Sequence, residues 1–306
     1  MGRYILKRIL ISLATLLVLI TVVFALVRLM PGDPFSSEKM TPQIRANLEK
    51  YYGFDKPILQ QYFTYIGRLA RGDLGYSMKY VNMTVNEIIA KAFPYSADLG
   101  LRALAISISI GLTLGIISAL NRKKPIDIVC VVVAIIGTSI PDFIMGYLLQ
   151  YFFGIKWGLL PIAQYKGFRY TILPAIGLGF YTLALVSRLM RSSMLEVVHQ
   201  DYIKTAKAKG CSPARIVWKH EVRNAILPVV TVLGPIVASV LTGTFVIESI
   251  FAIPGMGKFY VTSVQSLDYT LVLGMTVFFG AFLVTANLVV DIIYGFVDPR
   301  IRVGRK

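Results

Sequence analysis

The sequence predicts an all-α membrane protein, and three of its features support that class. The chain has 306 residues, of which 56% are hydrophobic and only 16% are charged, whereas soluble domains carry about 25% charged residues. Its mean hydropathy is +0.66. Six stretches are apolar and long enough to cross a bilayer core of about 30 Å, which takes roughly 20 helical residues. These values exclude an ordinary soluble domain.

The six expected membrane spans are separated by short loops and by two longer segments. They are Ile9–Leu29, Leu99–Leu120, Ile126–Phe153, Ile172–Leu189, Ala225–Phe251 and Thr270–Val297. The first span follows a basic start, as in a signal peptide, but its apolar run exceeds the roughly 7–15 residues of a cleaved signal. We therefore expect it to be a retained anchor.

The excess of basic residues predicts the orientation of the spans. The net charge is +16, from 32 Lys+Arg and 16 Asp+Glu, and in so apolar a chain it indicates sidedness, not nucleic-acid binding. With the N-terminus inside, the inner segments hold 18 basic residues and the short outer loops hold 4. Because basic residues favour the cytoplasmic side, both termini are predicted to be cytoplasmic.

The outer segment, residues 30–98, is predicted to form a small helical cap between the first two spans. Thr41-Pro42 is typical of a helix start, and apolar residues between Ile58 and Leu69 recur at helical spacing. Thr84 to Glu87 fits a capping box, which marks another helix start. The whole chain, residues 1–306, is expected to be one transmembrane domain that carries this cap.

The inner segment, residues 190–224, is predicted to hold two short helices joined by a tight turn. Asp201 to Lys209 has a helical pattern that Gly210 ends, and Ser212-Pro213 is typical of the start of the next helix. The segment mixes apolar and basic residues. From composition alone, it could lie on the anionic inner leaflet or dock in the groove of a partner protein.

The sequence offers no set of residues typical of a catalytic or metal site. Both histidines, His199 and His220, fall in the inner segment, so the spans lack a histidine base or a zinc-binding pair. Residues 255–258 (Gly-Met-Gly-Lys) look like the end of a phosphate loop, but the first glycine and the magnesium-binding Ser/Thr are missing. We therefore expect that the chain is not an enzyme and binds no cofactor or metal.

Two acidic residues within the predicted spans are candidates for a translocation path. An ionisable group inside a membrane is a functional candidate by default. Asp142 follows Pro141, and Glu248 shortly precedes the Pro-Gly pair at 254–255. Each acid therefore lies beside an expected helix irregularity that could line a cavity. A structural role fits both positions equally well.

Six motifs stand in order along almost the whole chain. They are 31–35 (PGDPF), 52–57 (YGFDKP), 72–77 (GDLGYS), 201–210 (DYIKTAKAKG), 248–257 (ESIFAIPGMG) and 298–300 (DPR). Together they resemble the inner-membrane permease of peptide-type ATP-binding-cassette (ABC) importers, specifically the B-type subunit of an oligopeptide permease. The resemblance implies a type I ABC importer permease-like fold that supplies half of the translocation path.

The same resemblance implies a coupling role for the inner segment. The stretch that ends at Gly210 is similar to the EAA loop, which seats in a groove of the ATPase subunit, although Lys204-Thr205-Ala206 stands where the general pattern has Glu-Ala-Ala. The residues that carry coupling would be Asp201, Tyr202, Lys204, Thr205, Ala206, Lys209 and Gly210. Docking is thereby favoured over lipid binding.

The resemblance also implies partners and a location. They are a homologous second permease, two ATPases that use ATP and magnesium, and an extracytoplasmic peptide-binding protein, assembled in the bacterial cytoplasmic membrane. Nickel, dipeptide and glutathione permeases resemble the same family and remain alternatives, although the spans hold no His or Cys cluster suited to nickel. A proton-coupled peptide transporter that uses Asp142 or Glu248 as a relay is the alternative of another class.

Overall fold

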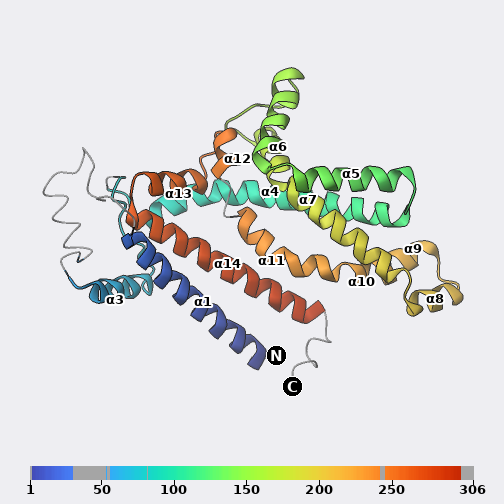
Figure 1. Ribbon diagram of the computed structural model, residues 1–306, viewed down its shortest axis with the longest axis horizontal. Helices are drawn as coiled ribbons and strands as arrows, with labels where there is room; N and C mark the ends of the chain where they lie inside the picture. The colour runs from blue at the N-terminus through green and yellow to red at the C-terminus, as the bar shows by residue number, and fades with distance from the viewer. Residues whose placement is uncertain (1, 30–52, 54–55, 81, 242–244, 298–306) are drawn as a thin grey trace.

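The protein is built from long helices in a bundle, with shorter helices around it (Figure 1). The computed structural model describes residues 2–29, 53, 56–80, 82–241 and 245–297. The long helices are α1 (Gly2–Leu29), α4 (Val85–Leu120), α5 (Pro125–Ser139), α7 (Phe168–Val197), α11 (Leu227–Leu241) and α14 (Tyr269–Val297). The shorter ones are α3 (Ile58–Leu69), α6 (Asp142–Leu149), α8 (Asp201–Ala208), α9 (Pro213–Arg215), α10 (Arg223–Ala225), α12 (Phe245–Ile250) and α13 (Met256–Gln265), with two π-helical stretches, η1 (Gln150–Lys156) and η2 (Ile216–Val222).

The predicted class, an all-α membrane protein, is confirmed. Among the described residues, five helical stretches are long and apolar enough to cross a membrane, and a bent pair of helices could supply a sixth crossing. The five are Leu6–Leu29, Val85–Leu120, Phe168–Val197, Leu227–Ile250 and Tyr269–Val289. Each overlaps a span that the hydropathy of the sequence predicts.

The third predicted span, Ile126–Phe153, holds the helix irregularity expected beside Asp142, and it consists of a bent pair of helices. The chain bends by 112° between Pro125–Ser139 and Asp142–Lys156. Pro141 causes the break because it has no backbone N–H to donate and its ring disfavours helical geometry in the preceding residue. Ile140 accordingly adopts an extended conformation, with φ −90° and ψ 123°.

Two helices extend beyond the predicted ends of their spans. Helix α4 begins at Val85, so residues 85–98 form the start of a long helix and are not a separate part of the cap. The capping box at Thr84 is confirmed, since its hydroxyl accepts a hydrogen bond from the Glu87 N–H at 3.1 Å. Helix α7 continues to Val197, into the predicted inner segment. The helix start predicted at Thr41-Pro42 lies outside the described residues.

Helices α4 and α7 form the centre of the bundle and pack along most of their lengths. Small residues allow this close approach. A Cβ atom on Gly111 would lie 2.8 Å from the Leu183 carbonyl oxygen, and one on Gly115 would lie 2.7 Å from the Ser187 carbonyl oxygen. The Gly111–Gly115 pair is therefore a helix-packing motif of the small-xxx-small kind.

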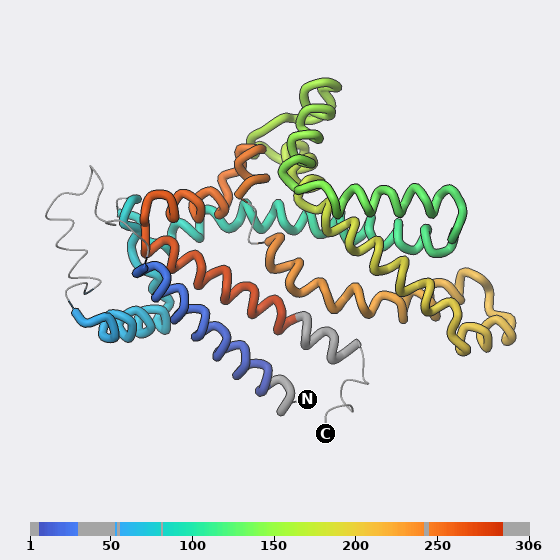
Figure 2. Tube along the Cα trace, viewed as in Figure 1, coloured from blue at the N-terminus to red at the C-terminus, as the bar shows by residue number. Residues whose placement is uncertain are grey.

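Helices α1 and α14 run side by side on one flank of this centre (Figure 2). Phe24 and Val27 of α1 pack with Tyr269 and Val272 of α14 in a buried cluster. Helix α3 lies against the same end of α1, whereas α8 and α9 project from the opposite end of the molecule (Figure 1). The helix predicted over 58–69 is thus confirmed, and the two non-membrane segments lie far apart.

Cys211 provides a test of the predicted orientation. It is partly exposed, whereas Cys130 is buried in α5. Because the inner segment carries many of the basic residues, we expect a membrane-impermeant maleimide to label Cys211 only after the cells are permeabilised. Labelling would be measured by mass spectrometry. As a matched control, Lys166→Cys in a Cys211→Ser background should be labelled in intact cells. Labelling of Cys211 in intact cells would contradict the topology.

Candidate functional site

The inner segment folds into two short helices joined by a glycine turn, as the sequence predicts. Gly210 has φ +72°, in the left-handed region that disfavours residues with a Cβ. Its N–H donates to the Lys207 carbonyl at 3.0 Å, and the Cys211 N–H donates to the Ala206 carbonyl at 3.2 Å. This is the Schellman pattern of helix termination. No atom lies within 4 Å of a Cβ built on Gly210, so the backbone torsion alone requires glycine.

The apolar side of α8 is buried inside this segment. Ile203 and Ala206 pack against Ile216 of η2, and Val197 and Cys211 border the cluster. Ile203 is completely buried. The predicted coupling residue Ala206 therefore supports α8 from within and does not lie on its outer surface.

Other predicted coupling residues form the outer surface of α8 and its end. Tyr202 is 42% exposed, and Lys204, Thr205 and Lys209 are exposed as well. Lys204 Nζ donates to the Asp201 carboxylate at 2.8 Å, but both side chains are so exposed that this ion pair adds little stability. The surface presented to a partner is thus polar, basic and partly aromatic.

Glu221 of η2 is a buried acid that the sequence analysis did not single out. It is 4% exposed, and its Oε2 atom has no hydrogen-bond partner within the part of the chain that the structure describes. Burial raises the pKa of the Glu221 carboxyl, and the positive charge of Lys207 opposes that shift in part. No local signal could have revealed this residue, because its burial depends on how η2 packs on the neighbouring helices.

Glu248, a candidate for the translocation path, is a fully buried residue of α12. Its carboxylate accepts hydrogen bonds from Ser96 Oγ at 2.6 Å and from the Gly257 N–H at 2.8 Å. A Cβ on Gly257 would lie 2.9 Å from Glu248 Oε2, so glycine lets the start of α13 approach the carboxylate. The stretch that looks like a phosphate loop therefore binds a carboxylate of its own chain. This geometry gives Glu248 a role in joining α12 and α13 to α4.

Asp142, the other path candidate, is the first residue of α6 and directly follows the break at Pro141. It is half-buried. Helix α6 packs on α12, where a Cβ on Gly146 would lie 3.0 Å from Ile247 Cδ1. The two candidate acids thus lie on neighbouring helices but in different surroundings. Their part in a path stays a prediction.

Asp268 is a further buried acid that the sequence analysis did not single out. It accepts hydrogen bonds from the backbone N–H groups of Met78, Lys79 and Leu271 at 3.1–3.2 Å and from the Ser77 hydroxyl. It thereby ties the segment after α3 to the start of α14. An aspartate just before an apolar helix is a typical N-cap signal, but that signal does not reveal partners so distant in sequence.

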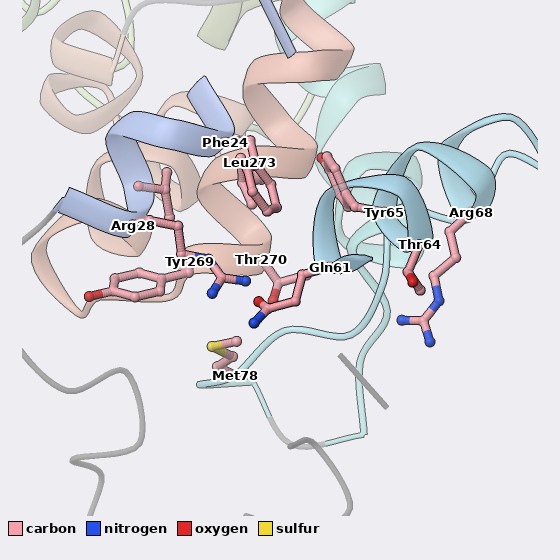
Figure 3. Close-up of a pocket in the computed structure, with 11 residues that line it drawn as sticks. Phe24, Arg28, Gln61, Thr64, Tyr65, Arg68, Met78, Tyr269, Thr270 and Leu273 are labelled. Atoms are coloured by element: carbon pink, nitrogen blue, oxygen red, sulfur yellow. The ribbon is translucent and has the colours of Figure 1, made fainter. Parts of the chain in front are cut away.

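A small cavity lies between α1, α3 and α14, at the end of the bundle that carries α3 (Figure 3). Its volume is about 40 Å³, which is room for a few water molecules. Phe24 and Arg28 line it from α1, Tyr65 and Arg68 from α3, and Leu273 from α14. The cavity is too small to hold a peptide, so we do not assign it to a substrate path.

The fold is similar to that of a solved structure. The chain resembles a solved structure described as a crystal structure of an amino acid ABC transporter with histidines, with a TM-score of 0.55. The match covers 69% of this chain and 94% of that one, at 14% sequence identity. A likeness at this identity concerns the fold alone.

Family models then match nearly the whole chain. The model of the binding-protein-dependent transport system inner membrane component matches residues 111–303, and the N-terminal model of the membrane component of such systems matches residues 1–100. The chain belongs to the family of binding-protein-dependent transport system inner membrane components.

Named relatives are similar over the full length. The dipeptide transport system permease protein DppB of Bacillus subtilis is 44% identical, with 100% of both chains covered. The oligopeptide transport system permease protein OppB of Haemophilus influenzae is 43% identical, and that of Escherichia coli is 39% identical, each over 99% of this chain and 100% of the relative. The resemblance to peptide-type ABC permeases is confirmed.

Glu221 makes the stability of the inner segment depend on pH. Because its pKa is raised in the folded protein, the folded state holds the proton more tightly than the unfolded state, and stability falls as pH rises above about 4.3, the ordinary glutamate value. We expect Glu221→Gln to raise the apparent Tm of the purified complex at neutral pH. The difference from wild type should disappear near pH 4. An unchanged or lower Tm at neutral pH would contradict this account.

Proposed function

We propose that this chain is the transmembrane permease subunit of an ATP-driven oligopeptide importer in the bacterial cytoplasmic membrane. The observation that carries the proposal is its full-length similarity, at 39–44% identity, to proteins named as oligopeptide and dipeptide transport permeases. Import of dipeptides is the second candidate, because the relative at 44% identity is named as a dipeptide permease. The membership of a binding-protein-dependent transport family supports both.

The complex would contain further subunits. A homologous second permease supplies the other half of the path, two ATPases bind and hydrolyse ATP with magnesium, and an extracytoplasmic binding protein delivers the peptide. This chain itself is then neither an enzyme nor a nucleotide-binding protein. The use of the Gly257 N–H by Glu248 supports this, because that backbone donor is already occupied by a carboxylate.

The inner segment would dock on an ATPase and carry its movement to the membrane helices. Its position at the projecting end of the molecule suits this role (Figure 1). Burial of Ile203 and Ile216 against each other also favours docking over lipid binding, because these apolar side chains are not free to enter a bilayer. Tyr202 and the lysines around it are exposed and form the surface that would meet a partner protein.

Transport would follow an alternating-access cycle. Closure of the ATPases moves the paired inner segments, and the helices rock so that the path opens to one side and then to the other. In this scheme both termini are cytoplasmic. Asp142 is the stronger candidate for a path-lining acid, because it is half-exposed at a helix break whereas Glu248 is committed to hydrogen bonds within the chain.

Substitution of Gly210 tests the coupling role. At φ +72° a residue with a Cβ costs about 1–2 kcal/mol, which lowers the population of the native turn roughly 5- to 30-fold. We expect Gly210→Val to abolish peptide uptake and binding-protein-stimulated ATPase activity. Gly210→Asn should retain both in large part, because asparagine tolerates this conformation.

Two control variants separate coupling from general misfolding. Gly158→Val places the same strain, at φ +62° with open space around the Cβ, in the loop between η1 and α7. It should insert normally and keep its ATPase stimulation. Lys258→Ala should leave the ATPase activity of the complex intact. Normal uptake by Gly210→Val would refute the coupling assignment.

Uptake measurements test the substrate. A strain that lacks this gene and its partner subunits should lose uptake of labelled tetra- or pentapeptides and regain it when all are restored. In membrane vesicles, uptake should require ATP and persist when a protonophore removes the proton gradient. If deletion leaves peptide uptake unchanged but abolishes nickel or glutathione accumulation, the assignment of peptides as the substrate is wrong. Loss of dipeptide uptake alone would favour the second candidate.

A further inference from the structure

A partly buried ion pair connects the helix that leads into the inner segment with the hairpin formed by α4 and α5. Arg191, near the end of α7, donates from Nε and Nη2 to the two carboxylate oxygens of Asp127 in α5, at 2.8 and 2.9 Å. Arg191 Nε also lies 3.0 Å from Ser118 Oγ of α4, and Ser118 donates to Asp127 at 2.5 Å. One guanidinium group thus joins three helices.

The same carboxylate also holds the turn of the hairpin. Asp127 accepts a hydrogen bond from the Lys123 N–H at 2.9 Å, and Lys123 has φ +68°, a conformation that a lysine adopts at a cost. Asp127 is only 5% exposed. All four of its hydrogen bonds therefore fix the geometry between the hairpin and α7.

Close backbone packing at the same level leaves α7 little freedom to slide along α4. A Cβ on Gly115 would lie 2.7 Å from both Met190 Cβ and the Ser187 carbonyl oxygen. Helix α5 approaches α7 as closely, since a Cβ on Gly137 would lie 2.6 Å from Ala184 Cβ. This packing fixes the distance of α7 from α4 and α5. The two parallel hydrogen bonds of the Arg191 guanidinium also fix the orientation of α7 relative to them.

We propose that Arg191 is a positioning residue for transport, which makes α4, α5 and α7 move as one body when the inner segment is displaced by its partner. The proposal rests on the proposed function, because it concerns how movement of the coupling segment reaches the membrane helices. Movement of α8 is transmitted directly to α7. Without the ion pair, α7 can rotate relative to the hairpin. ATP hydrolysis is then no longer fully coupled to movement of the helices that form the translocation path.

A simple stabilising role is the competing explanation, and it predicts different results. A buried ion pair is weak evidence for stability, because desolvation of the two charges offsets their attraction. If Arg191 served only folding, its loss would lower the amount of assembled complex, and uptake and ATPase activity would fall together. A positioning role predicts that the ratio of the two activities changes.

The first experiment measures peptide imported per ATP hydrolysed, with the complete purified complex in proteoliposomes. We expect Arg191→Met to assemble and to hydrolyse ATP, but to import at least about fivefold less peptide per ATP, within the usual range of coupling energies. Arg191→Lys keeps the positive charge but cannot form the two parallel hydrogen bonds. Its ratio of imported peptide to hydrolysed ATP should therefore lie between those of wild type and Arg191→Met. Arg122→Met is the matched control, because Arg122 is an exposed arginine in the turn of the same hairpin, and its ratio of imported peptide to hydrolysed ATP should equal that of wild type.

The second experiment does not depend on the substrate and keeps the two proposals distinguishable. Spin labels at Lys124→Cys in the hairpin and His199→Cys after α7, with Cys130 and Cys211 replaced by serine, report the distance between the two elements. In the complex with its ATPases, this distance should stay the same with and without ATP. In the Arg191→Met variant it should broaden or shift when ATP binds.

The two experiments distinguish failure of the Arg191 proposal from failure of the proposed function. An unchanged import ratio in Arg191→Met and Arg191→Lys, or an unchanged distance distribution in Arg191→Met, would overturn the role of Arg191. Absence of ATP-driven peptide uptake in the wild-type complex would overturn the proposed function instead, and the distance measurement would still decide whether α7 and the hairpin move together. If Arg191→Met fails to assemble, Arg191→Lys provides both measurements.

Discussion

The close approach of α4 and α7 is the constraint on which the rest of the structure depends. Gly111 and Gly115 bring one helix against the backbone carbonyls of the other, and no larger residue fits there without displacing α7. In a membrane, where lipid tails are as apolar as side chains, such packing supplies much of the attraction between helices. Helices α5, α6 and α11 then pack around this pair, and α7 carries the inner segment at its end.

Three buried carboxylates are the second organising feature, and each of them joins elements that are distant in sequence. Glu248 connects α12 and α13 with α4, Asp268 connects the segment after α3 with α14, and Asp127 connects the α4–α5 hairpin with α7. An unpaired charge in such surroundings costs several kcal/mol. Each acid is accordingly bonded to backbone N–H groups, hydroxyls or an arginine. These bonds hold the ends of the helices, where glycine packing alone does not set the orientation.

The inner segment combines internal rigidity with an exposed polar surface. Its apolar residues close a small cluster of their own, and Gly210 turns the chain without contact to any neighbouring side chain. A segment built in this way has a fixed internal geometry and is joined to the end of α7. That property suits a coupling element, and the family to which the chain belongs, a set of transport-system membrane components, supplies the context for such movement.

The amino-acid sequence alone determined the class, the approximate spans, the capping box at Thr84 and the glycine turn at Gly210. These features depend on composition, hydropathy and local backbone chemistry, all of which can be derived from the sequence. The tertiary structure alone decided the 112° bend after α5, the burial of Glu221 and the partners of Asp127, Glu248 and Asp268. A proline in the sequence predicts a break in a helix but not the angle of the break, because that angle depends on the helices packed around it. The partner of a buried charge is set by contacts between residues far apart in sequence, and no local pattern encodes them.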